Sequence, residues 1–132
     1  MRVNLENKNL PVLLIVEDDI ENLKFLKILL KNNFQIESCD NAEDFMSILD
    51  QRNIDVILMD ITIRGSKDGL QLTKEIKNNS KYSHIPIVGL TAHAFQKDKL
   101  NAMRAGVDYF FTKPVDGIIL RDKLLSFVKE NS

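Results

Sequence analysis

The sequence has little cysteine, no tryptophan and no long apolar stretch. It contains one cysteine, Cys39, in 132 residues. A single cysteine cannot form a disulfide within the chain, which favours a reducing compartment, so we expect the protein to lie in the cytoplasm. The longest apolar run is far shorter than the roughly 20 residues that a membrane-spanning helix requires. Residues 1–9 also lack the apolar core of a secretory signal.

The chain also lacks an excess of charge of either sign. Eighteen Lys and Arg residues stand against 19 Asp and Glu residues, for a net charge of −1. We find no basic cluster, which argues against a nucleic-acid partner. A hydrophobic content of 44% over this length is typical of one globular domain. We expect residues 1–10 to be an N-terminal lead-in and residues 11–130 to form that domain.

Short apolar runs rich in Val and Ile alternate with stretches of helical periodicity along the whole chain. The runs predict strands at Val12–Val16, Phe34–Ser38, Val56–Met59, Ile87–Leu90 and Val107–Phe111. The periodic stretches predict helices after the first strand, from Asp40, at residues 70–78, at residues 95–105 and from Asp116. Five strand–helix repeats predict a parallel sheet with helices on both faces.

The ends and buried faces of these helices also have sequence signals. The first helix places Ile20, Leu23, Leu26 and Leu30 on one predicted inward face. Asp40 and Glu43 have the spacing of a capping box at the start of the second helix. Gly106 suits the left-handed residue that often ends a helix, here the fourth.

Polar groups follow four of the five predicted strands. Glu17-Asp18-Asp19 follow the first strand, Asp60 the third, Thr91 the fourth and Lys113 the fifth. Because the carboxyl ends of parallel strands share one edge, we expect these side chains to meet there. Carboxylates, a hydroxyl and an ammonium group at one edge predict a site for Mg²⁺ and a phosphoryl group.

Each of these residues has an ordinary structural interpretation when it is considered alone. Asp18 or Asp19 would cap a helix, Thr91 would cap another, and Lys113 would be a solvated lysine with its stem on the sheet. The joint pattern favours a site, because adjacent acids repel one another and usually recruit a cation.

From Pro11 onward, the chain resembles the receiver domain of two-component response regulators, the CheY-like group. The resemblance is carried by Val16-Glu-Asp-Asp19, Leu58-Met-Asp60-Ile61, Asp68-Gly69, Leu90-Thr-Ala-His93-Ala94 and Lys113-Pro114. It implies a flavodoxin-like α/β fold, a three-layer sandwich around a doubly wound five-stranded parallel sheet of order 2-1-3-4-5. We expect a stand-alone, single-domain regulator.

The resemblance implies a phosphorylation site at Asp60. This carboxylate would accept a phosphoryl group from a sensor histidine kinase or a histidine phosphotransfer protein. Glu17, Asp18 and Asp60 would hold Mg²⁺ together with the backbone carbonyl of Thr62, and Glu17 would act through a metal-bound water. Lys113 would pair with Asp60 and then with the phosphoryl oxygens. The Lys113–Pro114 peptide bond is typically cis in this family.

The resemblance also implies a conformational switch. Thr91 would move toward the phosphoryl group, and Phe110, three residues before Lys113, would turn inward. The surface formed by the helix at residues 95–105, the strand at 107–111 and the last helix would then bind an unidentified protein target. The chain would catalyse only its own phosphotransfer and dephosphorylation. The resemblance also leaves open the formation of a weak or phosphorylation-dependent homodimer.

Two features depart from the common pattern of this family. Arg64 stands where a proline usually follows the phosphorylated aspartate, and the stretch to Gly69 is one residue longer than usual. Thr62 and His93 occupy the two variable positions that tune the lifetime of the phosphoryl group. None of these departures removes a catalytic group.

Four alternatives remain beside the leading interpretation. A flavin-binding module would need a phosphate-cradling loop after the first strand, where the acids at residues 17–19 would instead repel phosphate. A phosphatase with an aspartyl nucleophile would need a substrate-binding cap, for which the chain has no spare residues. A degenerate receiver acting as a scaffold would lack an acid or the lysine. A receiver cut from a hybrid histidine kinase would have this same sequence pattern.

Overall fold

The computed structural model describes residues 9–61, 68–92 and 96–131, in which strands and helices alternate strictly. The elements are β1 (Val12–Val16), α2 (Ile20–Leu30), β2 (Gln35–Cys39), α3 (Ala42–Gln51), β3 (Val56–Asp60), α4 (Gly69–Lys77), β4 (Ile87–Thr91), α5 (Gln96–Ala105), β5 (Tyr109–Thr112) and α6 (Gly117–Asn131). This alternation confirms the predicted α/β class.

The five strands form one parallel sheet in the order β2-β1-β3-β4-β5. This is the predicted order, with β2 at the edge and β1 and β3 adjacent in the middle. Strand order reverses between β1 and β3, and ligands of such sheets bind at the carboxyl ends of the strands at that point. The acids that follow β1 and end β3 lie there.

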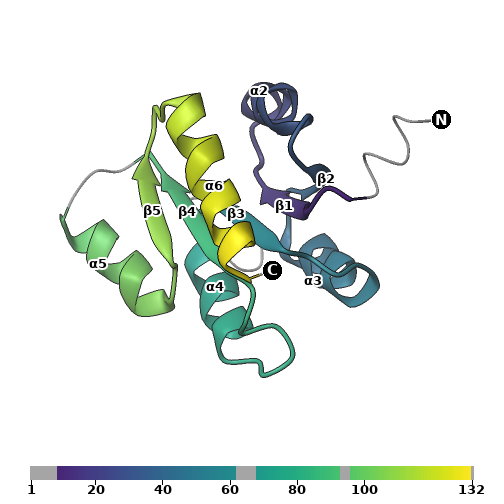
Figure 1. Cartoon of the computed structure of the whole chain (residues 1–132). Helices are drawn as coiled ribbons and strands as arrows, with labels where there is room; N and C mark the ends of the chain where they lie inside the picture. Colours follow the sequence, from purple (N-terminus) through teal and green to yellow (C-terminus); the bar gives the residue numbers. More distant parts are fainter. Residues whose placement is uncertain (1–8, 62–67, 93–95, 132) are drawn as a thin grey trace.

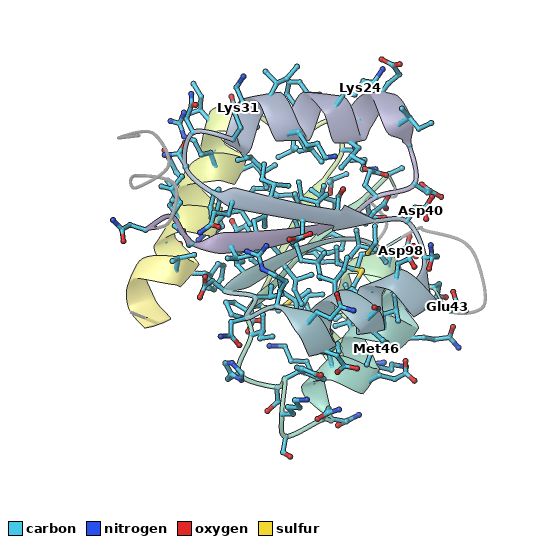
Figure 2. All side chains as sticks on the ribbon, turned by 90° about the vertical axis from the view of Figure 1, so that its right-hand side faces the viewer. Lys24, Lys31, Asp40, Glu43, Met46 and Asp98 are labelled. Carbon is cyan, nitrogen blue, oxygen red and sulfur yellow. The ribbon has the colours of Figure 1, made fainter. Side chains whose placement is uncertain are left out.

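Helices cover both faces of the sheet, so the molecule has three layers (Figures 1 and 2). On one face, α2 and α6 contribute Leu26, Leu30, Leu120 and Leu124 to a buried apolar cluster. On the other face, α3, α4 and α5 contribute a second cluster that includes Phe45, Leu72, Ile76 and Ala102. Strands β1, β3 and β4 are buried along their whole length, which explains their continuous apolar runs.

Two predicted strands began too early. Phe34 and Val107 are buried, as expected of strand residues, but neither belongs to a strand. The backbone N–H of Phe34 donates to the carbonyl of Leu30, at the end of α2, and that of Val107 donates to Ala102 in α5. Each apolar residue therefore completes the turn after a helix, and the strand starts later.

The predicted start of the second helix was wrong by one residue. Asn41, and not Asp40, is the N-cap of α3, because its side-chain oxygen accepts from the N–H of Asp44 at 2.8 Å. The side chain of Asp40 instead accepts from the Asn41 amide group. At the end of α5, Gly106 has the predicted left-handed conformation, with φ of 111°.

The predicted inward face of the first helix fails at its first residue. Leu26 and Leu30 are buried in α2, and Leu23 packs against the same cluster, but Ile20 is 69% exposed. Ile20 opens the helix beyond the carboxyl end of β1, where it borders a surface depression with Asp18 rather than the apolar side chains of the sheet.

Candidate functional site

Strand register brings the predicted site residues to one edge of the sheet. Val16 of β1 pairs with Met59 of β3, so the next residues, Glu17 and Asp60, are neighbours. Strand β3 pairs in turn with β4, which ends at Thr91, and β4 pairs with β5, which ends one residue before Lys113. A backbone hydrogen bond of 2.7 Å from Lys113 N to Thr91 O continues this pairing.

Lys113 forms ion pairs with two buried acids. Its Nζ lies 3.1 Å from Asp60 Oδ2 and 3.3 Å from Glu17 Oε1. Glu17 and Asp60 are each only 2% exposed, whereas the Lys113 side chain is 25% exposed. Because unpaired buried charges are costly, the lysine compensates two carboxylates that strand pairing forces together.

The cluster changes the proton affinities of its members. Burial raises the pKa of Glu17, and the neighbouring Asp60 carboxylate raises it further, while Asn22 and Lys113 act in the opposite direction. Burial disfavours the charged form of Lys113, but the two acids outweigh it and hold the pKa of Lys113 above its usual value. The lysine is therefore a permanent cation at neutral pH.

Asp18 completes a group of three acids with Glu17 and Asp60. One ligand oxygen from each of the three lies within 4.8 Å of those of the other two, and Asp18 is exposed while its neighbours are buried. Carboxylate oxygens are ligands for hard divalent cations such as Mg²⁺ and Ca²⁺. One exposed carboxylate beside two buried ones gives a cation access from solvent.

The first turn of α2 adds donors that the sequence interpretation missed. Asn22 Nδ2 donates to Glu17 Oε1, and the backbone N–H of Asp19 donates to Glu17 Oε2 at 3.3 Å. Asp19 also caps α2, its Oδ1 accepting from Asn22 N at 3.1 Å. The available sequence signal was a polar residue one turn into the helix that follows the acids.

The Asp68-Gly69 pair brings the start of α4 against the end of β3. Asp68 is the N-cap and forms a full capping box with Gln71. A Cβ on Gly69 would lie 2.6 Å from the carbonyl oxygen of Asp60 and 2.8 Å from Cα of Ile61. Glycine is required because backbone atoms occupy the space of a side chain. The pair therefore sets how closely α4 approaches the residue that ends β3.

The remaining predicted residues lie around this edge. Thr91 is 2% exposed at the end of β4. Phe110 is partly buried and packs against the cluster on the α3–α4–α5 face. The Lys113–Pro114 peptide is cis, as the resemblance implied. A depression of about 670 Å³, lined in part by Phe25 and Val115, opens beside Lys113.

Three predicted features lie outside the described residues. These are the Thr62 carbonyl, Arg64 and His93.

Among residues 9–61, 68–92 and 96–131, no helix is both long and apolar enough to cross a membrane.

Residues 13–125 match the family model of the response regulator receiver domain. The chain belongs to this family. The match covers β1 from its second residue, the other four strands and the start of α6. The cluster of Glu17, Asp18 and Asp60 is thus the acidic pocket of a two-component receiver domain.

Named relatives include whole proteins of similar length and much longer kinases. The chain is 33% identical to Protein PilH of Pseudomonas aeruginosa over 79% of its own length and 86% of PilH. It is 34% identical to hybrid signal transduction histidine kinase M of Dictyostelium discoideum over 88% of its length, but spans only 5% of that kinase. Receivers similar to this chain therefore occur inside histidine kinases as well.

Solved structures of receivers share the fold. A two-component response regulator of Clostridium difficile superposes with a TM-score of 0.83 at 28% identity, covering 92% of this chain and 99% of the other. The receiver domain of a sensor histidine kinase of Pseudomonas aeruginosa PAO1 superposes with a TM-score of 0.82 at 26% identity, covering 91% and 98%. That structure has a magnesium ion coordinated in its active-site cleft.

Proposed function

We propose that this receiver domain is a phosphorylation switch in which Asp60 accepts a phosphoryl group. The observation that carries the proposal is the position of Asp60, buried at the sheet edge with Lys113 Nζ 3.1 Å away and two further acids beside it. Burial limits the access of water to the carboxylate, and a donor protein would approach the cluster by way of the depression beside Lys113.

We propose Mg²⁺ as the resident cation of this site. Its ligands would be Asp18 and Asp60, with Glu17 acting through a bound water and the carbonyl of Thr62 adding a further oxygen. The donor set fits, since Mg²⁺ prefers oxygen ligands and keeps several waters, so few protein groups suffice. When bound, it would offset the repulsion between these acids and the oxygens of an incoming phosphoryl group.

The proposed reaction is a phosphoryl transfer between two side chains. A carboxylate oxygen of Asp60 attacks the phosphorus of a phosphohistidine on the donor protein, and an O–P bond forms as the P–N bond breaks. The electron pair stays on the imidazole nitrogen, which is then protonated by water. Later attack by water on the acyl phosphate releases inorganic phosphate and restores Asp60. The domain thus acts on its own side chain only.

Lys113 and Thr91 would stabilise the product. Once Asp60 carries the phosphoryl group, the Lys113 ammonium would pair with its oxygens, and the Thr91 hydroxyl would donate to another of them. Phosphorylation adds about 1.5 to 2 negative charges and new acceptor oxygens, which draw Thr91 and the chain after β4 toward them. Phe110 would then turn into the space that Thr91 vacates.

The output would be a change in the surface of α5, β5 and α6. Phosphorylation would bias a pre-existing equilibrium between two states of this surface, by its different affinity for each. A sensor histidine kinase or a histidine phosphotransfer protein would be the donor, and a downstream protein would bind the switched surface. The kinases among the relatives support this class of donor.

Mass measurement with a small phosphodonor tests the proposal. We expect incubation with Mg²⁺ and acetyl phosphate to add one base-labile phosphoryl group to the intact chain, and Asp60→Asn to abolish the addition. Asp40→Asn is the matched control, because it makes the same substitution at an exposed acid. Asp40 follows β2 at the same edge of the sheet, the edge to which the strand arrows point in Figure 2. An unmodified wild-type chain would contradict the proposal and favour the scaffold alternative.

A further inference from the structure

The carboxylate of Glu17 is bound at both oxygens. Oε1 accepts from Asn22 Nδ2 and from Lys113 Nζ, and Oε2 accepts from the backbone N–H of Asp19. With the side chain 1% exposed, these three donors and the surrounding protein leave it little freedom to turn. The orientation of this acid is therefore set by its hydrogen-bond partners and not by solvent.

Two of the three donors belong to the start of one helix. Asp19 and Asn22 are joined by the capping hydrogen bond of α2, from Asn22 N to Asp19 Oδ1. The same turn that begins the helix therefore holds the acid that follows β1. A displacement of this turn would move both donors together, and Glu17 with them.

Asn22 differs in kind from the third donor. Lys113 also binds Asp60, and its positive charge opposes the approach of a cation. The Asn22 amide is neutral, so it orients Glu17 without electrostatic competition with a divalent ion. Partners in the second layer of a metal site act in this way, and their loss typically costs about 10- to 100-fold in affinity.

We propose that Asn22 is a positioning residue that holds the Glu17 carboxylate in place, so that the first turn of α2 sets the affinity of the acidic site for Mg²⁺. The proposal rests on the proposed function, since it assumes that the cluster binds this ion. It adds a residue from outside the acidic cluster and a route by which α2 acts on the site.

A double-mutant cycle tests whether Asn22 acts through Glu17. Mg²⁺ is titrated by calorimetry into the wild type, Asn22→Leu, Glu17→Gln and the double variant. We expect Asn22→Leu to weaken Mg²⁺ binding about tenfold. In the Glu17→Gln background, the same substitution should have little further effect, because the group that Asn22 positions is gone. A tenfold loss in both backgrounds, or none in either, would overturn the proposal.

A matched control separates positioning from general damage to a helix. Asn101→Leu makes the same substitution at an exposed position of α5 and should leave Mg²⁺ affinity unchanged. Urea denaturation checks that each variant is folded. If Asn22→Leu does not fold, Asn22→Ala removes the same donor with the side chain best suited to a helix, and the same cycle applies.

The outcomes also separate this inference from the proposed function. If the wild type binds no Mg²⁺ and takes no phosphate from acetyl phosphate, both proposals fail together. If the wild type does both and Asn22→Leu binds Mg²⁺ as tightly, only the role of Asn22 is contradicted.

Discussion

Individual residues near the site differ widely in how their surroundings affect their chemistry. Burial and Asp60 raise the pKa of Glu17 despite its ion pair with Lys113, whereas the two acids raise the pKa of Lys113 despite its burial. Cys39, at the end of β2, is also buried, at 8% exposure, and its surroundings oppose ionisation as well. Burial raises the pKa of the Cys39 thiol to about 12, and the carboxylates of Asp44 and Asp40 add to the effect. The protein environment thus keeps the Lys113 side chain charged and the Cys39 thiol protonated.

Cys39 is therefore predicted to be an inert thiol. With a pKa of about 12 in place of an ordinary 9.0, the native thiolate fraction at pH 8 falls roughly a thousandfold. A thiol reagent such as DTNB should accordingly react far more slowly with the folded protein than with the protein in denaturant. The folded rate should rise about tenfold per pH unit from pH 8 to pH 10, because only the thiolate reacts.

The unfolded chain is the control for this experiment. Its rate should begin to level off near an ordinary thiol pKa, within the range where the folded rate still climbs. Equal rates for the folded and unfolded chains at pH 8 would show that Cys39 is accessible and ionisable, contrary to the structure.

At the scale of elements, close backbone contacts place the helices that frame the site. Helix α4 begins at Gly69 against the end of β3, where the backbone of Asp60 and Ile61 leaves no room for a Cβ. Helix α6 begins at another glycine, Gly117, whose added Cβ would lie nearest to the side-chain carbons of Leu29, at 3.1 Å or more. The first contact is with rigid backbone and the second with a side chain that can turn, so the two glycines differ in importance.

Substituting the two helix-starting glycines tests this difference. We expect Gly69→Ala to lower the free energy of unfolding by about 2 kcal/mol, because the new Cβ overlaps the backbone of Asp60 and Ile61. Gly117→Ala should change it by less than about 1 kcal/mol, because Leu29 can adjust and alanine favours a helix. Urea denaturation measures both. Equal effects of the two substitutions would contradict the assigned role of Gly69.

At the scale of the whole molecule, the buried acids of the site reduce the stability of the fold that positions them. Strand pairing places Glu17 beside Asp60 at 2% exposure, and like charges at that position repel. Lys113, delivered by β5 from the other side of β4, supplies the compensating charge. Three strands are thus linked through one charge cluster, and a change at any of them affects the whole sheet edge.

Removing the Lys113 charge should reveal how much the two buried acids destabilise the fold. In the absence of Mg²⁺, we expect Lys113→Met to lower the free energy of unfolding by about 2 kcal/mol at pH 7, since it leaves two buried acids without their cation. Burial and Asp60 raise the pKa of Glu17 in the folded protein above the unfolded value of 4.5. The protonated Glu17 therefore favours the folded state fully below pH 4.5, and this contribution to stability is lost as the pH rises through the folded pKa. The difference between variant and wild type should therefore grow from pH 4.5 to pH 7.

Lys24→Met is the matched control for this variant. Lys24 lies on the outer side of α2 in Figure 2, with a side chain 68% exposed, so its loss should change stability little at any pH. Urea denaturation at several pH values gives the comparison. A Lys113→Met protein as stable as the wild type at pH 7 would mean that the acids are not compensated by this lysine.

Local patterns in the chain were enough to predict the number and approximate positions of the strands and helices, and the polar residues at the strand ends. Apolar runs and 3.6-residue periodicity depend on neighbours in sequence. Glu17 and Asp60 directly follow apolar runs, and Lys113 follows one after a single threonine. The family resemblance then implied the strand order and the cis Lys113–Pro114 peptide, which periodicity alone does not specify.

The contacts where one element meets the next had to come from the folded molecule. Phe34 and Val107 are as apolar as strand residues, but their backbone N–H groups bind the preceding helices. Ile20 has the right helical spacing, but it is exposed at the start of α2, beyond the carboxyl end of β1. The binding of Asn22 to Glu17 and the approach of Gly69 to Asp60 depend on where α2 and α4 pack against the sheet. Such distances between elements follow from three-dimensional packing, which no pattern of adjacent residues encodes.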